Sequence, residues 1–297
     1  KPIANTGNFR FVEFPIYNIA VYPFYLVFGV NEMYHRLVSV IFSLGSTIFL
    51  YLITKKYKGE VIGFLSAFIF ATLPFSIFFS RTILPEPTLI FFSLGMLYFV
   101  DRWIWEGKKY LYWWGLIFSM IAFLIKPWAV FFALPLFYST YKKEGKISLK
   151  YFGFALIALT PFILWRFWIL QTPEGIPASN WLMNGDGIRF RPAFWWWIIS
   201  ERIGHEILGI TGAFLFFLGL LVKPGSGNYF LHIWALSLFL YFIIFATGNV
   251  RHDYYQVIFT PVASVFVALG MLSLIKGINS FIPRLWTIPV ACLFLLL

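Results

Sequence analysis

Six ionisable side chains lie at the edges of long apolar runs, where a charged group is costly to place. Carboxylates in such positions can deprotonate or orient a hydroxyl group, and cations there can stabilise the charge of a phosphate. Charged groups at membrane depth usually face a protein interior or a wet cavity. We therefore predict one shared polar cavity. The six residues are Glu13, Arg81, Glu86, Lys126, His252 and Asp253.

Four of these side chains also have purely structural interpretations. Lys126 ends an apolar run, and a lysine there can extend its ammonium group to the lipid headgroups. Arg81 can do the same or pair with Glu86, although the spacing does not guarantee a helical ion pair. Glu86 also suits the positive end of a helix dipole, and Glu13 is compatible with the same role at the next helix.

Aromatic residues accompany the charged residues in two later segments. The run from His252 to Tyr255 (HDYY) opens a late apolar stretch, and tyrosines are typical of the belt at a membrane surface. Arg191 precedes the run Trp195-Trp196-Trp197, which we expect to anchor a loop among the headgroups. Arg191 can hold a phosphate or simply meet lipid headgroups.

Metal binding is only weakly indicated. His205 and Glu206 join His252 and Asp253 as candidate ligands, but their spacing is not diagnostic of a metal site. The single cysteine, Cys292, excludes an intramolecular disulfide and a cysteine-based metal cluster. The sequence therefore predicts no certain cofactor and no metal-ligand set, with a divalent ion left open.

The composition determines the class of protein that positions these residues. The 297 residues are 60% hydrophobic and 12% charged, against about 45–50% and about 25% for a soluble globular domain. The sequence thus predicts an all-α polytopic membrane protein. The absence of an Asn-x-Ser/Thr sequon favours a prokaryotic plasma membrane.

Apolar stretches predict about ten transmembrane helices. We expect residues 1–35 to form an extracytoplasmic leading segment with an interface helix over 16–30, and residues 36–297 to form the transmembrane domain with an outer loop at 171–204. The chain starts in a polar stretch and ends in an apolar run, so we expect it to be truncated at both ends. The predicted spans are 36–54, 60–80, 85–102, 110–126, 127–141, 150–170, 205–222, 228–248, 255–275 and 284–297.

The net charge of +11 is explained by membrane orientation rather than by nucleic-acid binding. With ten spans, one side holds 13 basic and four acidic residues, for a net charge of +9. The other side holds 10 basic and eight acidic residues, for a net charge of +2. Basic residues concentrate in cytoplasmic loops, so the candidate cavity is predicted to face the extracytoplasmic side.

Several short motifs, in order along the chain, resemble one family. The sequence is similar to the polyprenyl-phosphate-dependent glycosyltransferases, which include the dolichyl-phosphate-mannose–protein mannosyltransferases and the bacterial aminoarabinose transferase of lipid A. The resemblance extends over nearly the whole chain. Its motifs are Glu13-Phe14-Pro15, Phe28-Gly29, Arg36-Leu37, the stretch from Arg81 to Glu86, Leu124-Ile125-Lys126-Pro127, and Asp253-Tyr254-Tyr255 with Pro261.

The resemblance implies a GT-C-like bundle with an extracytoplasmic active site. It also implies transfer of a sugar from a polyprenyl phosphate to an acceptor, with inversion at the anomeric carbon. The family's main catalytic acid lies in the first outer loop, which would precede Lys1. Three positions depart from the family pattern, because Glu13 stands where many members have Lys, Glu86 where Asp is common, and Pro127 where Gly is usual.

The resemblance and the chemistry together assign expected roles. Partners are a polyprenyl-phosphate-linked sugar, a protein, lipid or glycan acceptor, and membrane lipids, with no nucleic acid. The expected catalytic residues are Glu86 and Glu13; the expected ligands of the donor phosphate are Lys126, Arg81 and Arg36; and the expected sugar or acceptor contacts are His252, Asp253, Tyr254, Tyr255 and Arg191.

Three other functions remain as alternatives. A lipid-linked-sugar flippase or transporter commonly shows inverted repeats and polar groups near the midplane, whereas this sequence shows no repeat and collects its polar groups at one surface. An O-antigen-ligase-like enzyme would also use a polyprenyl donor. A non-catalytic membrane scaffold is the third alternative.

Overall fold

The computed structural model describes residues 13–146, 148–171 and 180–278, and this part of the chain contains helices and no strand. The principal helices are α1 (Ile16–Phe28), α2 (Glu32–Lys58), α3 (Glu60–Thr72), α4 (Pro74–Ser80), α5 (Glu86–Glu106), α6 (Lys109–Ile125), α7 (Leu134–Glu144), α8 (Leu149–Ile169), α11 (Gly209–Leu220), α12 (Phe230–Ile244) and α14 (Thr260–Ile278). The short elements are α9 (Asn180–Asn184), α10 (Pro192–Trp196), α13 (Ala246–Arg251), the 3₁₀-helices η2 (Pro127–Phe132), η3 (Ile188–Phe190), η5 (Gly225–Gly227) and η6 (Asp253–Phe259), and the π-helix η4 (Trp197–Ile207).

Four continuous helices in the described ranges are long and apolar enough to cross a membrane: α2, α5, α8 and the stretch Asp253–Gly277, which joins η6 to α14. The number rises to six if two bent pairs each form one span. The α3–α4 pair bends by 64°, and the pair from Pro192 to Leu220 bends by 116°. The predicted count of ten is therefore not confirmed, and the predicted span 284–297 lies outside the described residues.

Short and broken helices explain the difference in count. The helices α6 and α12 have 17 and 15 residues, fewer than the roughly 20 that cross a bilayer without tilt or thinning. The predicted span 127–141 is a 3₁₀ turn followed by the 11-residue helix α7. Hydropathy detects these apolar segments but does not reveal where the backbone bends.

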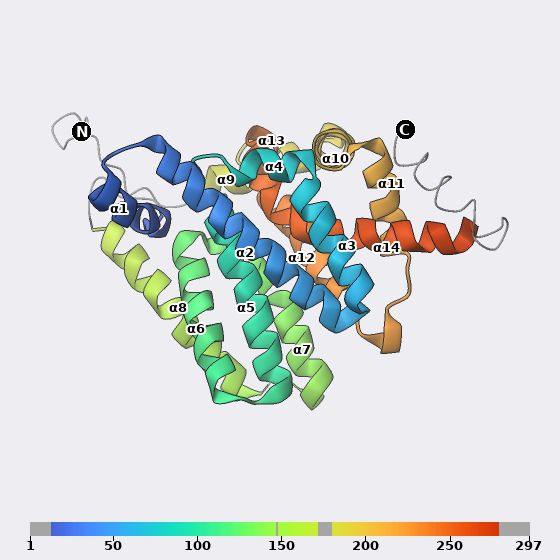
Figure 1. Cartoon of the computed structure of the whole chain (residues 1–297), viewed down its shortest axis with the longest axis horizontal. Helices are drawn as coiled ribbons and strands as arrows, with labels where there is room; N and C mark the ends of the chain where they lie inside the picture. The colour runs from blue at the N-terminus through green and yellow to red at the C-terminus, as the bar shows by residue number, and fades with distance from the viewer. Residues whose placement is uncertain (1–12, 147, 172–179, 279–297) are drawn as a thin grey trace.

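The helix α1 lies against the start of α2. The Tyr17 hydroxyl donates to the His35 carbonyl at 2.8 Å, and the Tyr25 hydroxyl lies 2.8 Å from His35 Nδ1. The helix α2 begins at Glu32 rather than at 36, because the Asn31 side chain caps it by accepting from the Met33 N–H at 2.9 Å. These bonds fix the direction in which the chain enters the bundle (Figure 1).

Two glycines allow α11 and α14 to pack backbone to backbone. A Cβ added at Gly219 would lie 1.9 Å from the Phe266 carbonyl oxygen, and one at Gly270 would lie 1.8 Å from the Leu215 carbonyl oxygen. Small residues permit such close approach between membrane helices. The contact fixes α14, which follows directly from the tyrosine-bearing η6.

The two ends of the bundle differ (Figure 1). Short helices α4, α9, α10 and α13 gather at one end, and the α5–α6 turn and the end of α7 lie at the other. At this second end, buried Asp101 accepts hydrogen bonds from Lys56 and from Tyr57 at 2.8 Å, and from Ser139 at 2.6 Å. A buried carboxylate needs such partners. Asp101 thus joins α2, α5 and α7.

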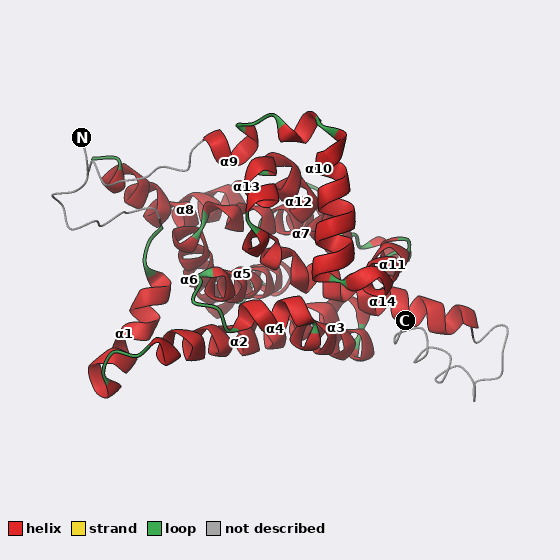
Figure 2. Ribbon diagram, turned by 90° about the horizontal axis from the view of Figure 1, so that it is seen from above, coloured by secondary structure: helices red, strands yellow, loops and turns green. Residues whose placement is uncertain are grey.

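The described part of the predicted outer loop, residues 180–204, is largely helical. The elements α9, η3, α10 and η4 form an arc beside α12 and α13, as Figure 2 shows from above. The helix η4 continues across the boundary predicted between loop and span at 204/205 and ends at Ile207. Arg189 Nη2 donates to the Ile244 carbonyl at 2.8 Å, and Arg202 Nη2 donates to the Val250 carbonyl at 3.4 Å. These arginines attach the arc to the end of α12 and to α13.

Candidate active site

The break between α6 and α7 directs Lys126 into the protein. A residue before proline is disfavoured in the α region, and Lys126, which precedes Pro127, is extended with φ −152° and ψ 138°. The helix α6 therefore ends at Ile125, and η2 starts immediately afterwards. The Lys126 side chain is only 5% exposed, so the alternative that it snorkels to the headgroups is wrong.

Glu86 faces Lys126 from the first turn of α5. The prolines at 85 and 87 suit this position because they lack the N–H groups that a helix start leaves unpaired. An acid there also interacts favourably with the helix dipole. The Glu86 side chain is 2% exposed, and its Oε1 accepts a hydrogen bond from Lys126 Nζ. Glu86 therefore pairs with Lys126 and not with Arg81.

Glu13 approaches the same ammonium group from the segment before α1. Its Oε1 lies 3.3 Å from Lys126 Nζ. The Phe14 N–H donates to the Leu124 carbonyl at 3.2 Å, which holds this segment against the end of α6. The buried Lys126 ammonium thus contacts two carboxylates. The attraction between the ammonium and the carboxylates offsets the cost of removing each group from water.

Burial raises the pKa of the Glu13 carboxyl above its ordinary value. The positive charge of Lys126 opposes this effect only in part, and the negative charge of Glu86 adds to it. Glu13 therefore takes up a proton at a higher pH than an ordinary glutamate.

Tyr254 and Tyr255 form the third side of the site. Lys126 Nζ lies 5.6 Å and 5.5 Å from the centres of their rings, within the range of a cation–π contact. Both tyrosines belong to η6, and Trp128 packs against Tyr255 with ring centres 5.5 Å apart. Of the six residues predicted to share a polar cavity, Glu13, Glu86 and Lys126 lie together, and the two tyrosines that follow Asp253 pack against the lysine.

One carboxylate oxygen in the site is available for chemistry. Glu86 Oε2 is buried and has no hydrogen-bond partner in the described ranges. Buried polar atoms are rarely left unpaired in folded proteins. Since Oε1 is held by Lys126, Oε2 is placed to accept a proton or a hydrogen bond from a hydroxyl group that enters beside the ammonium.

Arg36 and Arg81 lie together but outside this group. Arg36 Nη1 donates to the Arg81 carbonyl at 3.3 Å, and Arg36 Nη2 lies 3.7 Å from Glu32. Both arginines are exposed. Arg36 belongs to α2, and Arg81 lies in the turn between α4 and α5. Within the described residues, no hydrogen bond or ion pair joins either one to Lys126 or Glu86.

The other predicted contacts lie at the rim. His252 packs on both tyrosines, with ring centres 5.3 Å and 5.2 Å away, and faces Trp181 at 6.2 Å. Asp253 is exposed and accepts from the Tyr254 N–H at 2.8 Å. Arg191 is exposed between η3 and α10.

Sequence reasoning missed Arg166 and Asp186. Arg166, in the last turn of α8, attracts the Glu13 carboxylate electrostatically. It is the one charged residue between Tyr151 and Gln171, so a lone charge within an apolar run was the available signal. Asp186 accepts from the Thr247 hydroxyl at 2.6 Å and joins η3 to α13. No sequence signal identified that pairing.

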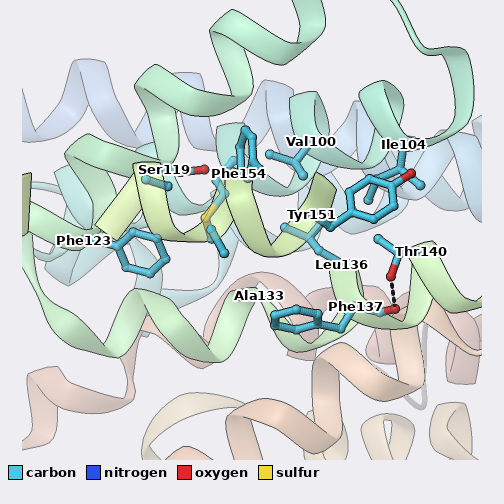
Figure 3. A pocket seen from close by; sticks show the side chains of 13 residues that line it. Val100, Ile104, Ser119, Phe123, Ala133, Leu136, Phe137, Thr140, Tyr151 and Phe154 are labelled. Atoms are coloured by element: carbon cyan, nitrogen blue, oxygen red, sulfur yellow. Dashed lines mark hydrogen bonds between the residues drawn. The ribbon is translucent and has the colours of Figure 1, made fainter. Parts of the chain in front are cut away.

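Two cavities between the described helices lie away from the charged group. A cavity of about 50 Å³ lies between α5, α6, α7 and α8, and Figure 3 shows that its labelled side chains, such as Val100, Phe123 and Phe154, are mostly apolar. The Thr140 hydroxyl there donates to its own helix, at 2.7 Å from the Phe137 carbonyl. A larger apolar groove of about 500 Å³ is lined by α3, α4, α11 and α14.

The candidate metal ligands do not assemble. No group of three or more His, Cys, Asp or Glu side chains is suitably placed to hold a metal ion in the part of the chain that the structure describes. Glu206 is instead the ion-pair partner of Arg202.

Comparison with known proteins identifies the family. The profile of the dolichyl-phosphate-mannose-protein mannosyltransferases matches residues 15–168, just over half of the chain. The chain belongs to this family. The matched range runs from α1 to α8 and includes Glu86, Lys126 and Arg166.

The fold of this family member is also found in a solved structure. The crystal structure of ArnT from Cupriavidus metallidurans bound to undecaprenyl phosphate covers 87% of the chain, with a TM-score of 0.62 and 14% sequence identity. The protein is thus an integral membrane protein with the GT-C fold of that glycosyltransferase, as expected from the sequence.

Two curated relatives come from Aquifex aeolicus (strain VF5), and both are described as uncharacterized proteins. One is 36% identical over 97 residues, which is 32% of this chain and 23% of the relative. The other is 29% identical over 176 residues, which is 57% of this chain and 34% of the relative. The chain spans about half of ArnT and between a quarter and a third, roughly, of these two relatives (23% and 34%).

Proposed function

We propose that the protein transfers a sugar from a polyprenyl-phosphate carrier to the hydroxyl group of an acceptor, with inversion, on the extracytoplasmic side. The proposal rests on the ion pair between the buried Lys126 and Glu86. The second carboxylate oxygen of Glu86 is unpartnered within the described structure. Membership of the mannosyltransferase family supports it. The likeness of the fold to a glycosyltransferase solved with undecaprenyl phosphate supports it too.

The geometry suggests how the bonds are exchanged. Glu86 Oε2 orients the acceptor hydroxyl and takes its proton while the hydroxyl oxygen attacks the anomeric carbon. The bond from that carbon to the phosphate oxygen breaks, and its electron pair remains on the phosphate. Lys126 stabilises the negative charge that develops there. Attack from the face opposite the phosphate gives inversion.

The surrounding residues take supporting roles in this proposal. Tyr254, Tyr255 and His252 offer ring faces for the sugar, and Arg36 and Arg81 attract the phosphate to the turn between α4 and α5. In this proposal Asp253 and Arg191, which are both exposed, contact the acceptor. The net charge of +9 on the opposite side favours a cytoplasmic location for that side.

The apolar groove suits the carrier lipid. Its volume of about 500 Å³ falls within the usual range of ligand pockets, roughly 300–1,000 Å³. The groove reaches Leu73 and Pro74 at the start of α4, and α4 packs against η6, which carries the two tyrosines. A polyprenyl tail in the groove would bring its phosphate toward the site.

Replacement of Glu86 tests the proposal. The Glu86→Gln change keeps the shape and a hydrogen-bond acceptor for Lys126 but removes the proton acceptor. We expect the rate of labelled-sugar transfer from a polyprenyl phosphate to fall about 100-fold or more. Glu13 still compensates Lys126 in this variant, so we expect the protein to be expressed and folded, with a lower thermal stability that does not account for the loss of activity. Glu60→Gln, at a side chain that is 71% exposed and paired with Lys55, is the control and should retain full activity. Full activity in Glu86→Gln would overturn the assignment.

A further inference from the structure

The ends of two helices enclose the segment that carries Glu13. The Phe14 N–H is bonded to Leu124 near the end of α6. The Phe14 ring meets Trp165 of α8 edge-on, with ring centres 5.0 Å apart and planes at 79°. Arg166 follows Trp165 and attracts the Glu13 carboxylate. Glu13 therefore experiences two cations, Lys126 from α6 and Arg166 from α8.

Arg166 has donor capacity that the described residues do not use. Its Nη1 is buried and has no hydrogen-bond partner among them, and its guanidinium lies 5.2 Å from the centre of the Phe162 ring. A guanidinium presents a fixed fork of donors that matches a phosphate. An unused buried donor of this kind points to an anion as its partner.

The charges around Glu13 limit what can enter. Lys126 and Arg166 supply two positive charges, and Glu13 and Glu86 supply two negative charges, so the group is neutral. A sugar-bearing polyprenyl phosphate is a phosphodiester with one negative charge. Its addition would leave a net negative charge in a buried site, which is unfavourable. Exchange of the phosphodiester for the Glu13 carboxylate keeps the group neutral.

We propose that Lys126 and Arg166 form the subsite for the donor phosphate, and that Glu13 occupies this subsite until the phosphate displaces it. The inference rests on the proposed function, and it adds Arg166 as a phosphate ligand and Glu13 as a competing anion. The Phe14 N–H anchors the backbone beside Glu13, so in this proposal it is the Glu13 side chain that moves when the phosphate enters.

Binding measurements on the full-length protein in detergent test this subsite. The probe is undecaprenyl phosphate, with phosphatidylglycerol and inorganic phosphate as comparison anions. Arg166→Gln should weaken binding of undecaprenyl phosphate about tenfold, and Arg166→Lys should recover most of the loss because it keeps the charge. Glu13→Gln should tighten binding about threefold, since it removes the competing anion; an effect of that size is within the range of a single charge interaction.

Two controls separate binding from folding. Arg102→Gln removes an arginine near the C-terminal end of α5, whereas Glu86 lies at its start; Arg102 pairs there with Glu106, and the change should leave binding unchanged. Thermal melts without ligand report folding. If Arg166→Gln does not fold, Glu13→Gln still tests the subsite, because a structural role for Glu13 gives no reason for tighter binding.

The outcomes distinguish this inference from the proposed function. Wild-type binding with no change in folded Arg166→Gln, or no tightening in Glu13→Gln, overturns the subsite and leaves the proposed function intact. An equal loss for phosphatidylglycerol or inorganic phosphate overturns its assignment to the donor. Failure of wild-type protein to bind undecaprenyl phosphate overturns both proposals.

Discussion

The central feature at the scale of residues is a buried lysine between two carboxylates. Lys126 is compensated by Glu86 and Glu13. Removal of one partner of a buried ion pair is costly because the other charge is left uncompensated. The stability of this group therefore depends on its net charge. A variant that restores the charge balance without restoring the catalytic side chains separates the contribution to stability from the role in catalysis.

A double substitution makes that separation measurable. Lys126→Met should lower the free energy of unfolding by about 3–5 kcal/mol, because Glu86 is left buried without its cation. Lys126→Met combined with Glu86→Gln should recover much of that loss in thermal melts but none of the transfer activity. Equal instability of the single and double variants would show that the charge balance does not stabilise the site.

Single residues differ in how far the sequence predicted them. Glu13, Glu86, Lys126, Tyr254 and Tyr255 stood out as charged or aromatic groups at the edges of apolar runs, and they lie together. The spacing could not decide whether Glu86 pairs with Arg81 or Lys126. That choice depends on the packing of α5 against α6, which brings together residues 40 positions apart.

At the scale of elements, breaks in helices position the site. Pro127 ends α6 so that Lys126 turns inward, and Pro74 starts α4 after the 64° bend from α3. The second bend also borders the apolar groove, through Leu208. Hydropathy predicted residues 60–80 as one whole span because the apolar pattern continues across the bend between α3 and α4. The number of spans was therefore predicted less well than the helical class.

The groove yields a prediction about the carrier lipid. Thr72 lines the groove, and its hydroxyl bonds only within its own helix, at 2.8 Å from the Phe68 carbonyl. Thr72→Phe fills part of the groove and should raise KM for a long-chain polyprenyl donor about tenfold, which corresponds to about 1.4 kcal/mol. A short-chain donor should be unaffected.

The matched control is Thr160→Phe. Thr160 is exposed on α8 and also bonds within its own helix, at 2.9 Å from the Leu156 carbonyl. It should leave KM unchanged for both donors. If Thr72→Phe raised KM equally for the short and long donors, the groove would not be the site of the lipid tail.

At the scale of the whole molecule, two buried charge groups brace the two ends of the bundle. The Asp101 group joins α2, α5 and α7, and the Lys126 group joins α5, α6 and the segment before α1. Charge counting along the sequence assigned these groups to opposite sides of the membrane. Composition and the ordered motifs predicted the fold class and the family. They did not predict the helical arc over residues 180–207, because its charged and aromatic residues are typical of a surface loop.

The central claim is that the protein moves a sugar off a polyprenyl phosphate rather than moving the lipid-linked sugar across the membrane. The most direct measurement follows a radiolabelled sugar on undecaprenyl phosphate in proteoliposomes supplied with a membrane extract as the source of acceptor. We predict that the label leaves the carrier, that undecaprenyl phosphate is released in equal amount, and that Glu86→Gln abolishes both. Label that crosses the bilayer while still attached to its carrier would contradict the account.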